Sequence, residues 1–306
     1  MSKAYGSVEW LEEKFRSAEV DPWGLSWRGF EAVRYEKVLK ILKDALAKRR
    51  VSPQDLRILD VGCSTGIFTR RLSALGGNVT GIDASETAIS RARLQSGEIT
   101  YKAGSIVDPA LEMGNKDVIT CLEVIYYVEE SAQPAFLSAI GRNLAEDGIF
   151  LISSLVGRPP YFTEERLVKL VRDHFYIDSA HFYGCAWTAK VEAFLFGLWN
   201  KVYRIRQFLT TADPSAQEEL LNSVTRSYHK RESLKKLKAA MERNQVAKAG
   251  INAASSLFLK AANGCLKWHW PARWADQVAA IFHLRHTHTI LALTKKKSSE
   301  KGNESV

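Results

Sequence analysis

The stretch that decides the fold reads Leu59-Asp60-Val61-Gly62-Cys63-Ser64-Thr65-Gly66. The residues that lead into it, Leu56–Val61, are apolar and partly β-branched, as in a short buried strand. Small residues in the turn let a ligand approach the backbone. The apolar spacing from Ile67 onward predicts a helix, whose first N–H groups are hydrogen-bond donors. The sequence therefore predicts a strand, a ligand-binding turn and a helix.

A carboxylate stands at the end of the next predicted strand. We expect that strand over Asn78–Ile82, and Asp83 follows it directly. A carboxylate in this place can accept both hydrogen bonds of a ribose diol, as in nucleotide-binding βαβ units. The alternative is an ordinary strand, turn and helix with a surface aspartate. Because the spacing and both end residues fit together, we favour a nucleoside site.

The residues of the turn also indicate which nucleoside is bound. A dinucleotide fingerprint needs Gly-x-Gly-x-x-Gly, whereas this turn has only Gly62 and Gly66 and begins with Asp60. An acid there disfavours phosphates and favours a cationic sulfonium ligand. The turn resembles motif I of the class I S-adenosylmethionine-dependent methyltransferases, Asp/Glu-x-Gly-x-Gly-x-Gly, with Ser64 in place of the central glycine. The resemblance implies S-adenosylmethionine rather than a nicotinamide or a flavin.

The following segments extend the predicted sheet. Strands are expected over Ile99–Lys102, Asp117–Leu122 and Ile149–Ser154, with helices between them. Such alternation predicts a parallel α/β sheet, whose ligands gather at the carboxyl ends of the strands. The fold class expected is a Rossmann-like class I methyltransferase sheet, parallel with one antiparallel strand. In this superfamily the residues after the third strand meet the adenine, which implies contacts from Ser105 and Ile106.

Two further segments are similar to one methyltransferase family. They are Asp21-Pro22-Trp23, followed by Trp27 and Arg34-Tyr35-Glu36-Lys37, and Leu122-Glu123-Val124-Ile125-Tyr126-Tyr127-Val128. Both resemble the NodS-like N-methyltransferases, which methylate an amino sugar of a chitooligosaccharide; Leu122 replaces a serine of that family. The resemblance covers about residues 20–155 and implies that Tyr35, Trp23 and Trp27 close over the cofactor. It further implies that Glu123 and Tyr127 flank the transferred methyl group.

These arguments give the expected site residues. A hydroxyl acceptor must lose a proton and an amine must arrive neutral. A carboxylate such as Glu123, or one of His174 and His181, could take up that proton. The alternatives are that Glu123 caps a helix, that one of Tyr126 and Tyr127 packs in the core, and that the tryptophans are hydrophobic anchors. The predicted catalytic residues are Glu123, Tyr127 and His181, and the predicted cofactor-binding residues are Tyr35, Asp60, Gly62, Ser64, Gly66, Asp83, Ala84, Ser105, Ile106, Leu122 and Glu123.

The second half of the chain predicts an insertion. A sixth strand is expected over Phe175–Tyr183 and a seventh, antiparallel one only at residues 286–294, so residues 186–285 lie between them. This segment is mostly helical in pattern and carries 16 Lys+Arg against 7 Asp+Glu, which is 16 − 7 = +9. It also holds five of the eight tryptophans. It could be a glycan lid, an anionic-membrane surface or, less favoured, a nucleic-acid platform; the alternative is a helical cap.

Composition is consistent with one α/β domain that has appendages. Residues 1–50 are expected to be an N-terminal helical cover, 51–185 the cofactor-binding core and 295–306 a disordered tail. The four cysteines have no metal-ligand spacing, so we expect no metal and a reducing, cytoplasmic location. No signal peptide or long apolar run is apparent, so membrane contact would be peripheral, at the inner face of a membrane.

The favoured function is S-adenosylmethionine-dependent methylation of N or O on a small polar or sugar-containing acceptor. One alternative is a peripheral membrane enzyme that methylates a lipid-linked glycan or a lipid headgroup. The alternative of another class is a non-catalytic cofactor-binding protein that uses the basic insertion for interaction. The sequence does not name the acceptor.

Overall fold

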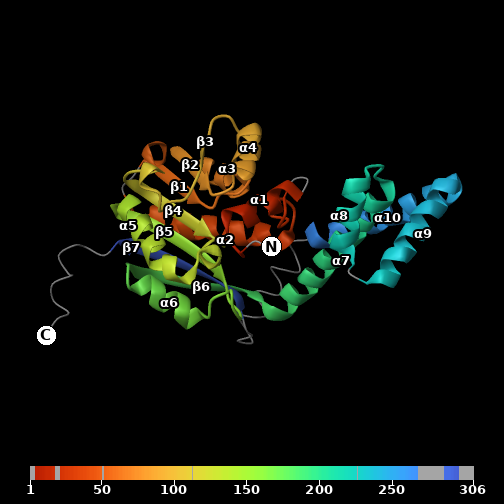
Figure 1. Ribbon diagram of the computed structural model, residues 1–306. Helices are drawn as coiled ribbons and strands as arrows, with labels where there is room; N and C mark the ends of the chain where they lie inside the picture. Colours follow the sequence, from red (N-terminus) through yellow and green to blue (C-terminus); the bar gives the residue numbers. More distant parts are fainter. Residues whose placement is uncertain are drawn as a thin grey trace. The chain divides into compact units, whose positions relative to one another are not determined.

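The computed structural model describes residues 4–17, 21–49, 52–111, 113–225, 227–267 and 286–295. The chain divides into two compact units (Figure 1). The first comprises Met1–Cys185 and Arg273–Val306, and the second comprises Ala186–Ala272. Residues 268–285 of the predicted insertion and the predicted tail, apart from Lys295, lie outside the described residues.

The first unit is built on a seven-stranded sheet in the order β3-β2-β1-β4-β5-β7-β6. Neighbouring strands from β3 to β5 run parallel, and β7 runs antiparallel to both β5 and β6. The predicted fold class is therefore confirmed. The strands are β1 (Arg57–Val61), β2 (Asn78–Asp83), β3 (Thr100–Ala103), β4 (Lys116–Leu122), β5 (Leu144–Leu155), β6 (Phe175–Cys185) and β7 (His286–Lys295).

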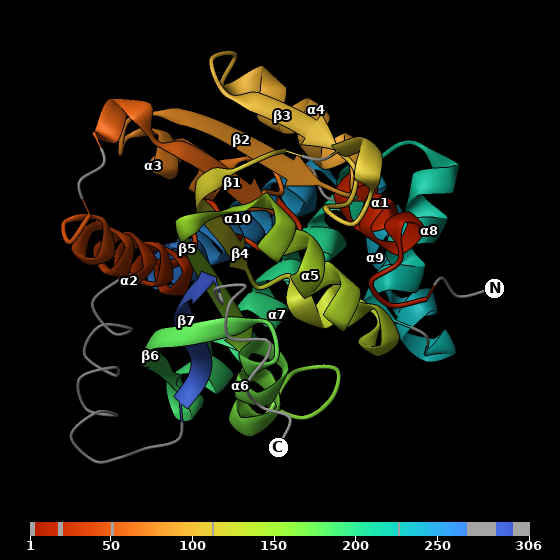
Figure 2. The same cartoon turned by 90° about the vertical axis from the view of Figure 1, so that its left-hand side faces the viewer.

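Helices flank this sheet (Figure 2). The α-helices of the first unit are α1 (Val8–Ser17), α2 (Gly29–Leu46), α3 (Ile67–Ser73), α4 (Glu86–Gln95), α5 (Gln133–Asn143) and α6 (Glu164–Arg172). Short 3-10 turns occur at η1 (Pro53–Asp55), η2 (Pro109–Leu111), η3 (Ile125–Tyr127) and η4 (Glu130–Ala132). The buried parts of the central strands are mostly apolar, because helices cover both faces of a parallel sheet. Leu59, Ile119 and Phe150 accordingly lie fully buried in the core.

The order of the strands places the ligand edge of the sheet. Both β2 and β4 are parallel neighbours of β1, and the chain fills the β2–β3 side of β1 before it crosses to β4 on the other side. In open α/β sheets a ligand binds outside the carboxyl ends of the strands at such a switch point. The turn after β1, the end of β2 and the end of β4 meet at this edge.

The second unit is helical. It contains α7 (Ala186–Thr210), α8 (Pro214–Val224), α9 (Tyr228–Arg243) and α10 (Gln245–Lys267). Its small core brings together Phe208, Leu221 and Met241. The buried Lys238 donates from Nζ to the carbonyl oxygens of Phe208 and Thr211, which satisfies carbonyls at the end of α7. Within the described residues, no helix has the length and apolar character needed to cross a bilayer.

Candidate active site

The turn after β1 is held in a left-handed backbone conformation at three residues. The φ angles are +73° at Gly62, +52° at Ser64 and +74° at Gly66. A Cβ on Gly62 would lie 2.2 Å from Val124 Cγ2, and one on Gly66 would lie 2.4 Å from Tyr101 Oη. Both glycines are therefore needed for conformation and for space. Ser64 adopts the conformation for which the motif normally uses glycine, at the cost of some backbone strain.

Asp83 holds this turn from the end of β2. Its two carboxylate oxygens accept hydrogen bonds from the backbone N–H groups of Ser64 (2.8 Å) and Ser85 (2.9 Å). Burial raises the pKa of Asp83, and the two N–H donors oppose that shift. A carboxylate oxygen has two lone-pair positions, so each oxygen keeps one acceptor position for a ligand hydroxyl.

Asp60 points into the protein. Its carboxylate accepts hydrogen bonds from the hydroxyls of Thr69 on α3 and Thr120 on β4, each at 2.7 Å. Burial raises the pKa of Asp60 to about 6, although the two hydroxyl donors lower it. The residue thus ties β1, α3 and β4 together just before the turn, and both of its oxygens are engaged by threonines.

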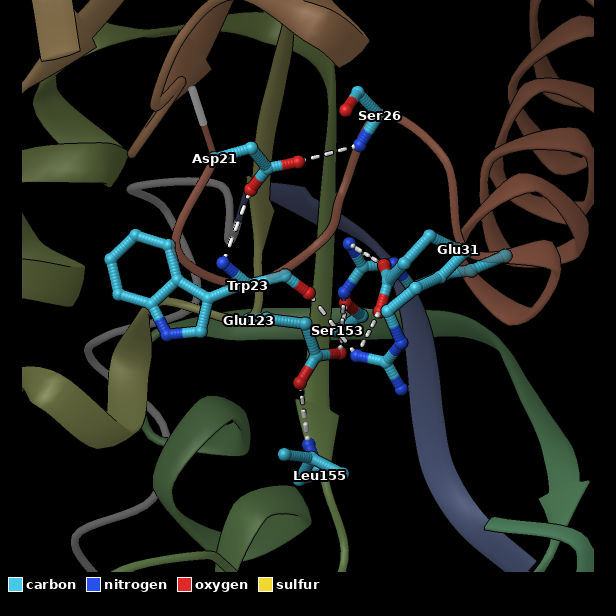
Figure 3. Close-up of polar contacts among 9 residues, drawn as sticks. Asp21, Trp23, Ser26, Glu31, Glu123, Ser153 and Leu155 are labelled. Carbon is cyan, nitrogen blue, oxygen red and sulfur yellow. Dashed lines mark hydrogen bonds and ion pairs between the residues drawn. The ribbon is translucent and has the colours of Figure 1, made fainter. Parts of the chain in front are cut away.

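Glu123 follows β4 and has a strained backbone, with φ at +61°. Its Oε1 accepts a hydrogen bond from Ser153 Oγ (2.7 Å), and its Oε2 accepts one from the backbone N–H of Leu155 (2.9 Å; Figure 3). Such strain in a non-glycine residue is typical of functional sites, where the surrounding contacts enforce it. Here two hydrogen bonds from β5 fix the carboxylate at the switch point.

A buried ion-pair network joins Glu123 to the N-terminal cover. Arg34 of α2 lies 3.5 Å from Glu123 Oε1 and 2.5 Å from Glu31 Oε2, and it is almost fully buried. Arg28 lies 3.8 Å from Glu31 and donates to the carbonyl oxygen of Trp23. The Glu31 carboxylate contributes most to raising the pKa of Arg34, against the effect of burial. The cover is therefore bonded to the end of β4.

The loop that carries Trp23 is folded around Asp21. Its carboxylate accepts hydrogen bonds from the backbone N–H groups of Trp23 (3.1 Å) and Ser26 (2.7 Å; Figure 3). Burial raises the pKa of Asp21, and these two donors oppose the shift. The Asp-Pro-Trp segment therefore forms a turn that fixes the backbone of Trp23.

Aromatic rings gather around Tyr127, four residues after Glu123 in the chain. Its ring centroid lies 5.4 Å from Tyr5, 5.9 Å from Trp10 and 6.3 Å from Trp23. It also lies 4.7 Å from Tyr126. We call Tyr5, Trp10, Trp23, Tyr126 and Tyr127 the aromatic cluster. Burial is the main cause that raises the pKa of Tyr127 and lifts that of Tyr5 to about 12, so both phenols stay protonated at neutral pH.

Comparison with known proteins agrees with this geometry. Residues 58–148 match the family described as "Methyltransferase domain". The chain carries a class I S-adenosylmethionine-dependent methyltransferase domain.

Two curated relatives that match part of the chain are O-methyltransferases by name. "Ubiquinone biosynthesis O-methyltransferase" from Xanthomonas axonopodis pv. citri (strain 306) is 31% identical over 157 residues, 48% of this chain and 65% of that protein. The protein of that name from Bordetella parapertussis (strain 12822 / ATCC BAA-587 / NCTC 13253) is 36% identical over 109 residues, 34% of this chain and 44% of that protein. The chain thus spans less than two thirds of the length of these relatives.

A solved structure has a similar arrangement. It is the N-methyltransferase NodS from Bradyrhizobium japonicum WM9, in complex with S-adenosyl-L-homocysteine. The sequences are 23% identical, the TM-score is 0.49, and the similarity covers 57% of this chain and 89% of that one.

The turn of the methyltransferase domain fits a methyl-donating nucleoside. Gly62 and Gly66 leave the backbone open, and Asp83 offers acceptor positions. Ser64 Oγ is buried and has no hydrogen-bond partner among the described residues. A buried hydroxyl without a partner is costly, so a ligand that bonds it would relieve that cost.

The other predicted cofactor residues lie around the same edge. Ile106 is buried in the core, and Ser105 just before it is exposed after β3. Ala84 and Leu122, at the ends of β2 and β4, are half-buried. Tyr35 is buried and stacks on Phe68 of α3, with ring centroids 5.0 Å apart. Their contacts with the cofactor stay predictions.

The structure does not bring His181 together with Glu123 and Tyr127. His181 lies on β6, three strands from β4, which is about 14 Å at normal strand spacing. Its Nε2 lies 3.1 Å from Ser179 Oγ. Burial lowers the pKa of His181, as does the charge of Lys37 on α2. His174 is likewise elsewhere, with Nδ1 3.4 Å from Ser138 Oγ.

Several residues of the site were missed by sequence reasoning. Glu31 and Arg34 form the buried ion pair, Ser153 bonds Glu123, and Tyr5 and Trp10 complete the aromatic cluster. The spacing of three between Glu31 and Arg34 signals only a local helix pair. The approach of Arg34 to Glu123 depends on how α2 packs on the sheet, which no local pattern reveals.

Proposed function

We propose that this protein transfers a methyl group from S-adenosylmethionine to a nitrogen or oxygen of a small polar acceptor that carries a sugar or another ring. The aromatic cluster beside the fixed carboxylate of Glu123 is the observation that supports this acceptor class. Aromatic side chains give a flat apolar surface on which ring faces stack. The cluster adjoins the edge of the sheet where the cofactor turn lies, so a ring held there presents its substituents near the donor.

The side chains of the site have distinct roles in the proposal. When bound, S-adenosylmethionine supplies an electrophilic methyl group on a positively charged sulfur. Asp83 and the glycine turn hold the nucleoside. Glu123 accepts the N–H or O–H of the acceptor through the Oε2 lone pair that Leu155 leaves free, because Ser153 and Arg34 both engage Oε1. Tyr127 stays protonated, so it packs against the acceptor or donates to it. Much of the acceleration comes from alignment of the nucleophile with the methyl carbon.

Both acceptor atoms remain in the proposal. The curated relatives are O-methyltransferases by name, which favours oxygen. The likeness of the Asp-Pro-Trp and Glu-Val-x-Tyr-Tyr segments to NodS-like enzymes favours nitrogen. A cytoplasmic site of action is part of this proposal.

The decisive experiment has two parts. Calorimetry with S-adenosylhomocysteine tests the cofactor site, and we expect binding by the unmodified chain and at least tenfold weaker binding by Asp83→Ala. Incubation with methyl-labelled S-adenosylmethionine and a cell extract then identifies the labelled product. If the unmodified chain does not bind S-adenosylhomocysteine, the proposed cofactor site and therefore the proposed function are wrong.

Glu123→Gln separates turnover from binding. Glutamine keeps the size of the side chain but is a far weaker proton acceptor. We expect turnover to fall by about tenfold to a hundredfold, with cofactor affinity within about twofold. Unchanged turnover would make Glu123 a structural cap, and a chain that binds the cofactor but labels nothing would support the non-catalytic alternative.

A further inference from the structure

The second unit exposes apolar side chains on two helices that pack together. On α7, Phe194 is 69% exposed, and Val191 and Leu198 lie on the same face at helical spacing. On α10, Leu257 is 71% exposed and Phe258 is also exposed. The two helices contact one another more extensively than any other helix pair of the chain that is described. A solvated helix normally presents polar residues on its outer face.

The exposed face of α10 is apolar along most of its length. Leu257 is flanked at helical spacing by the exposed Ala253, Ala254, Ala261 and Gly264. From Gln245 to Lys267 the sequence contains no acidic residue. Lys260 and Lys267 border this face on one side, and both are exposed. The helix therefore combines an apolar strip with a basic border.

The same pattern occurs on α7. Val191, Phe194 and Leu198 form the apolar strip of this helix. Successive residues of an α-helix are turned by about 100° around its axis, so Lys190 and Lys201 lie just beside that strip. Both lysines are exposed. An apolar strip bordered by lysines is typical of helices that lie in a membrane interface, with the apolar groups among the acyl chains and the cations among the headgroups.

Charge decides among the possible partners. Residues 186–272 contain 14 Lys+Arg and 6 Asp+Glu, which is +8, whereas the rest of the chain has 29 Lys+Arg and 28 Asp+Glu, which is +1. A second copy of the unit would bring +8 against +8, which opposes association. A nucleic acid would match the charge but leave Phe194 and Leu257 in water. Only an anionic lipid surface satisfies both features at once.

We propose that residues 186–272 dock on anionic membranes through the faces of α7 and α10 that carry Phe194 and Leu257. The strips enter the acyl-chain boundary, while Lys190, Lys201, Lys260 and Lys267 lie at the phosphate groups. This inference is independent of the methyl-transfer reaction, because it needs no acceptor and no cofactor.

The test is sedimentation of the full chain with vesicles. We expect binding to phosphatidylcholine vesicles that contain phosphatidylglycerol, little binding to phosphatidylcholine alone, and weaker binding at high salt. Phe194→Glu and Leu257→Glu should each weaken binding by about tenfold or more. Each removes a large apolar side chain that the membrane would bury and adds a negative charge that the anionic lipid repels. The control is Leu94→Glu in the first unit, where Leu94 is 88% exposed and the effect should be under twofold.

Each other outcome overturns the proposal. Equal binding by Leu257→Glu, Phe194→Glu and Leu94→Glu would remove these faces from the contact. A wild-type chain that binds heparin but not anionic vesicles would indicate a surface for polyanions. A wild-type chain that forms a dimer, which Leu257→Glu disrupts, would indicate that a second copy of the protein covers these faces. The helical circular-dichroism signal of the same variants should be unchanged, which shows that the second unit is still folded. Calorimetry with S-adenosylhomocysteine tests the proposed function separately, because the cofactor turn and Asp83 lie in the first unit.

Discussion

The lack of space for a side chain at Gly62 predicts that substitutions of Gly62 and Val124 have coupled effects on stability. Gly62→Ala places a methyl group 2.2 Å from Val124 Cγ2, at a φ of +73°. The left-handed conformation costs an L-residue about 1–2 kcal/mol, and overpacking adds about 1–3 kcal/mol. We therefore expect Gly62→Ala to lower the free energy of unfolding by about 2–5 kcal/mol. Cofactor affinity should fall with it, because the turn must shift.

Shortening Val124 separates the cost of the backbone conformation at residue 62 from the cost of overpacking. Val124→Ala removes the clashing Cγ2 and leaves Val124 Cβ at 3.3 Å, a tight but tolerable distance. By itself it costs about 1.6 kcal/mol for the lost methyl groups. In the double variant only the backbone cost should remain, so the two changes should be less than additive by about 1–3 kcal/mol.

The assay is urea unfolding of the four chains of this cycle, followed by circular dichroism. The matched control is Gly97→Ala, because a Cβ on Gly97 meets nothing within 4 Å, and its stability should change by less than about 0.5 kcal/mol. If the effects of Gly62→Ala and Val124→Ala simply add, the contact between the cofactor turn and the end of β4 is not what excludes a side chain at residue 62.

Three further predictions concern buried charges. Arg34→Met should lower the free energy of unfolding by about 3–5 kcal/mol, because Glu31 and Glu123 lose the cation between them. Adding Glu31→Gln should restore part of the lost stability. A loss under about 1 kcal/mol for Arg34→Met would contradict the ion-pair network. Burial lowers the pKa of His288 to about 3, so the unfolded chain binds an extra proton as pH falls below about 6.5. Between about pH 7 and 4, His288→Phe should therefore lose about 3 kcal/mol less stability than the wild type, as measured from urea unfolding midpoints. Burial raises the pKa of Asp60 to about 6, so its contribution to stability is lost as pH rises from about 4 through 6. The stability of Asp60→Asn relative to the wild type should accordingly increase by about 2 kcal/mol between about pH 4 and 6. Parallel curves of unfolding free energy against pH for the two chains would contradict this prediction.

The sequence by itself determined the sheet and the cofactor turn. Strand, turn and helix around Gly62 are encoded by neighbours in the chain, and the apolar runs at Asn78–Ile82 and Asp117–Leu122 fix two further strands. Glycine is needed at Gly62 and Gly66 for local reasons, so a motif can find them. The departure at Ser64 was visible in the sequence, but only the backbone shows that serine takes the left-handed conformation.

Only the tertiary structure decided which side chains meet at the end of β4. Arg34 pairs with Glu123 across residues far apart in the chain, because α2 packs where its buried face covers the sheet. The order of the strands separates His181 from Glu123, because β6 lies three strands from β4 in the same sheet. Local patterns specify secondary structure because backbone hydrogen bonds and turn conformations are short-range. The meeting of distant side chains depends on how whole helices and strands pack, and short-range patterns do not contain that information.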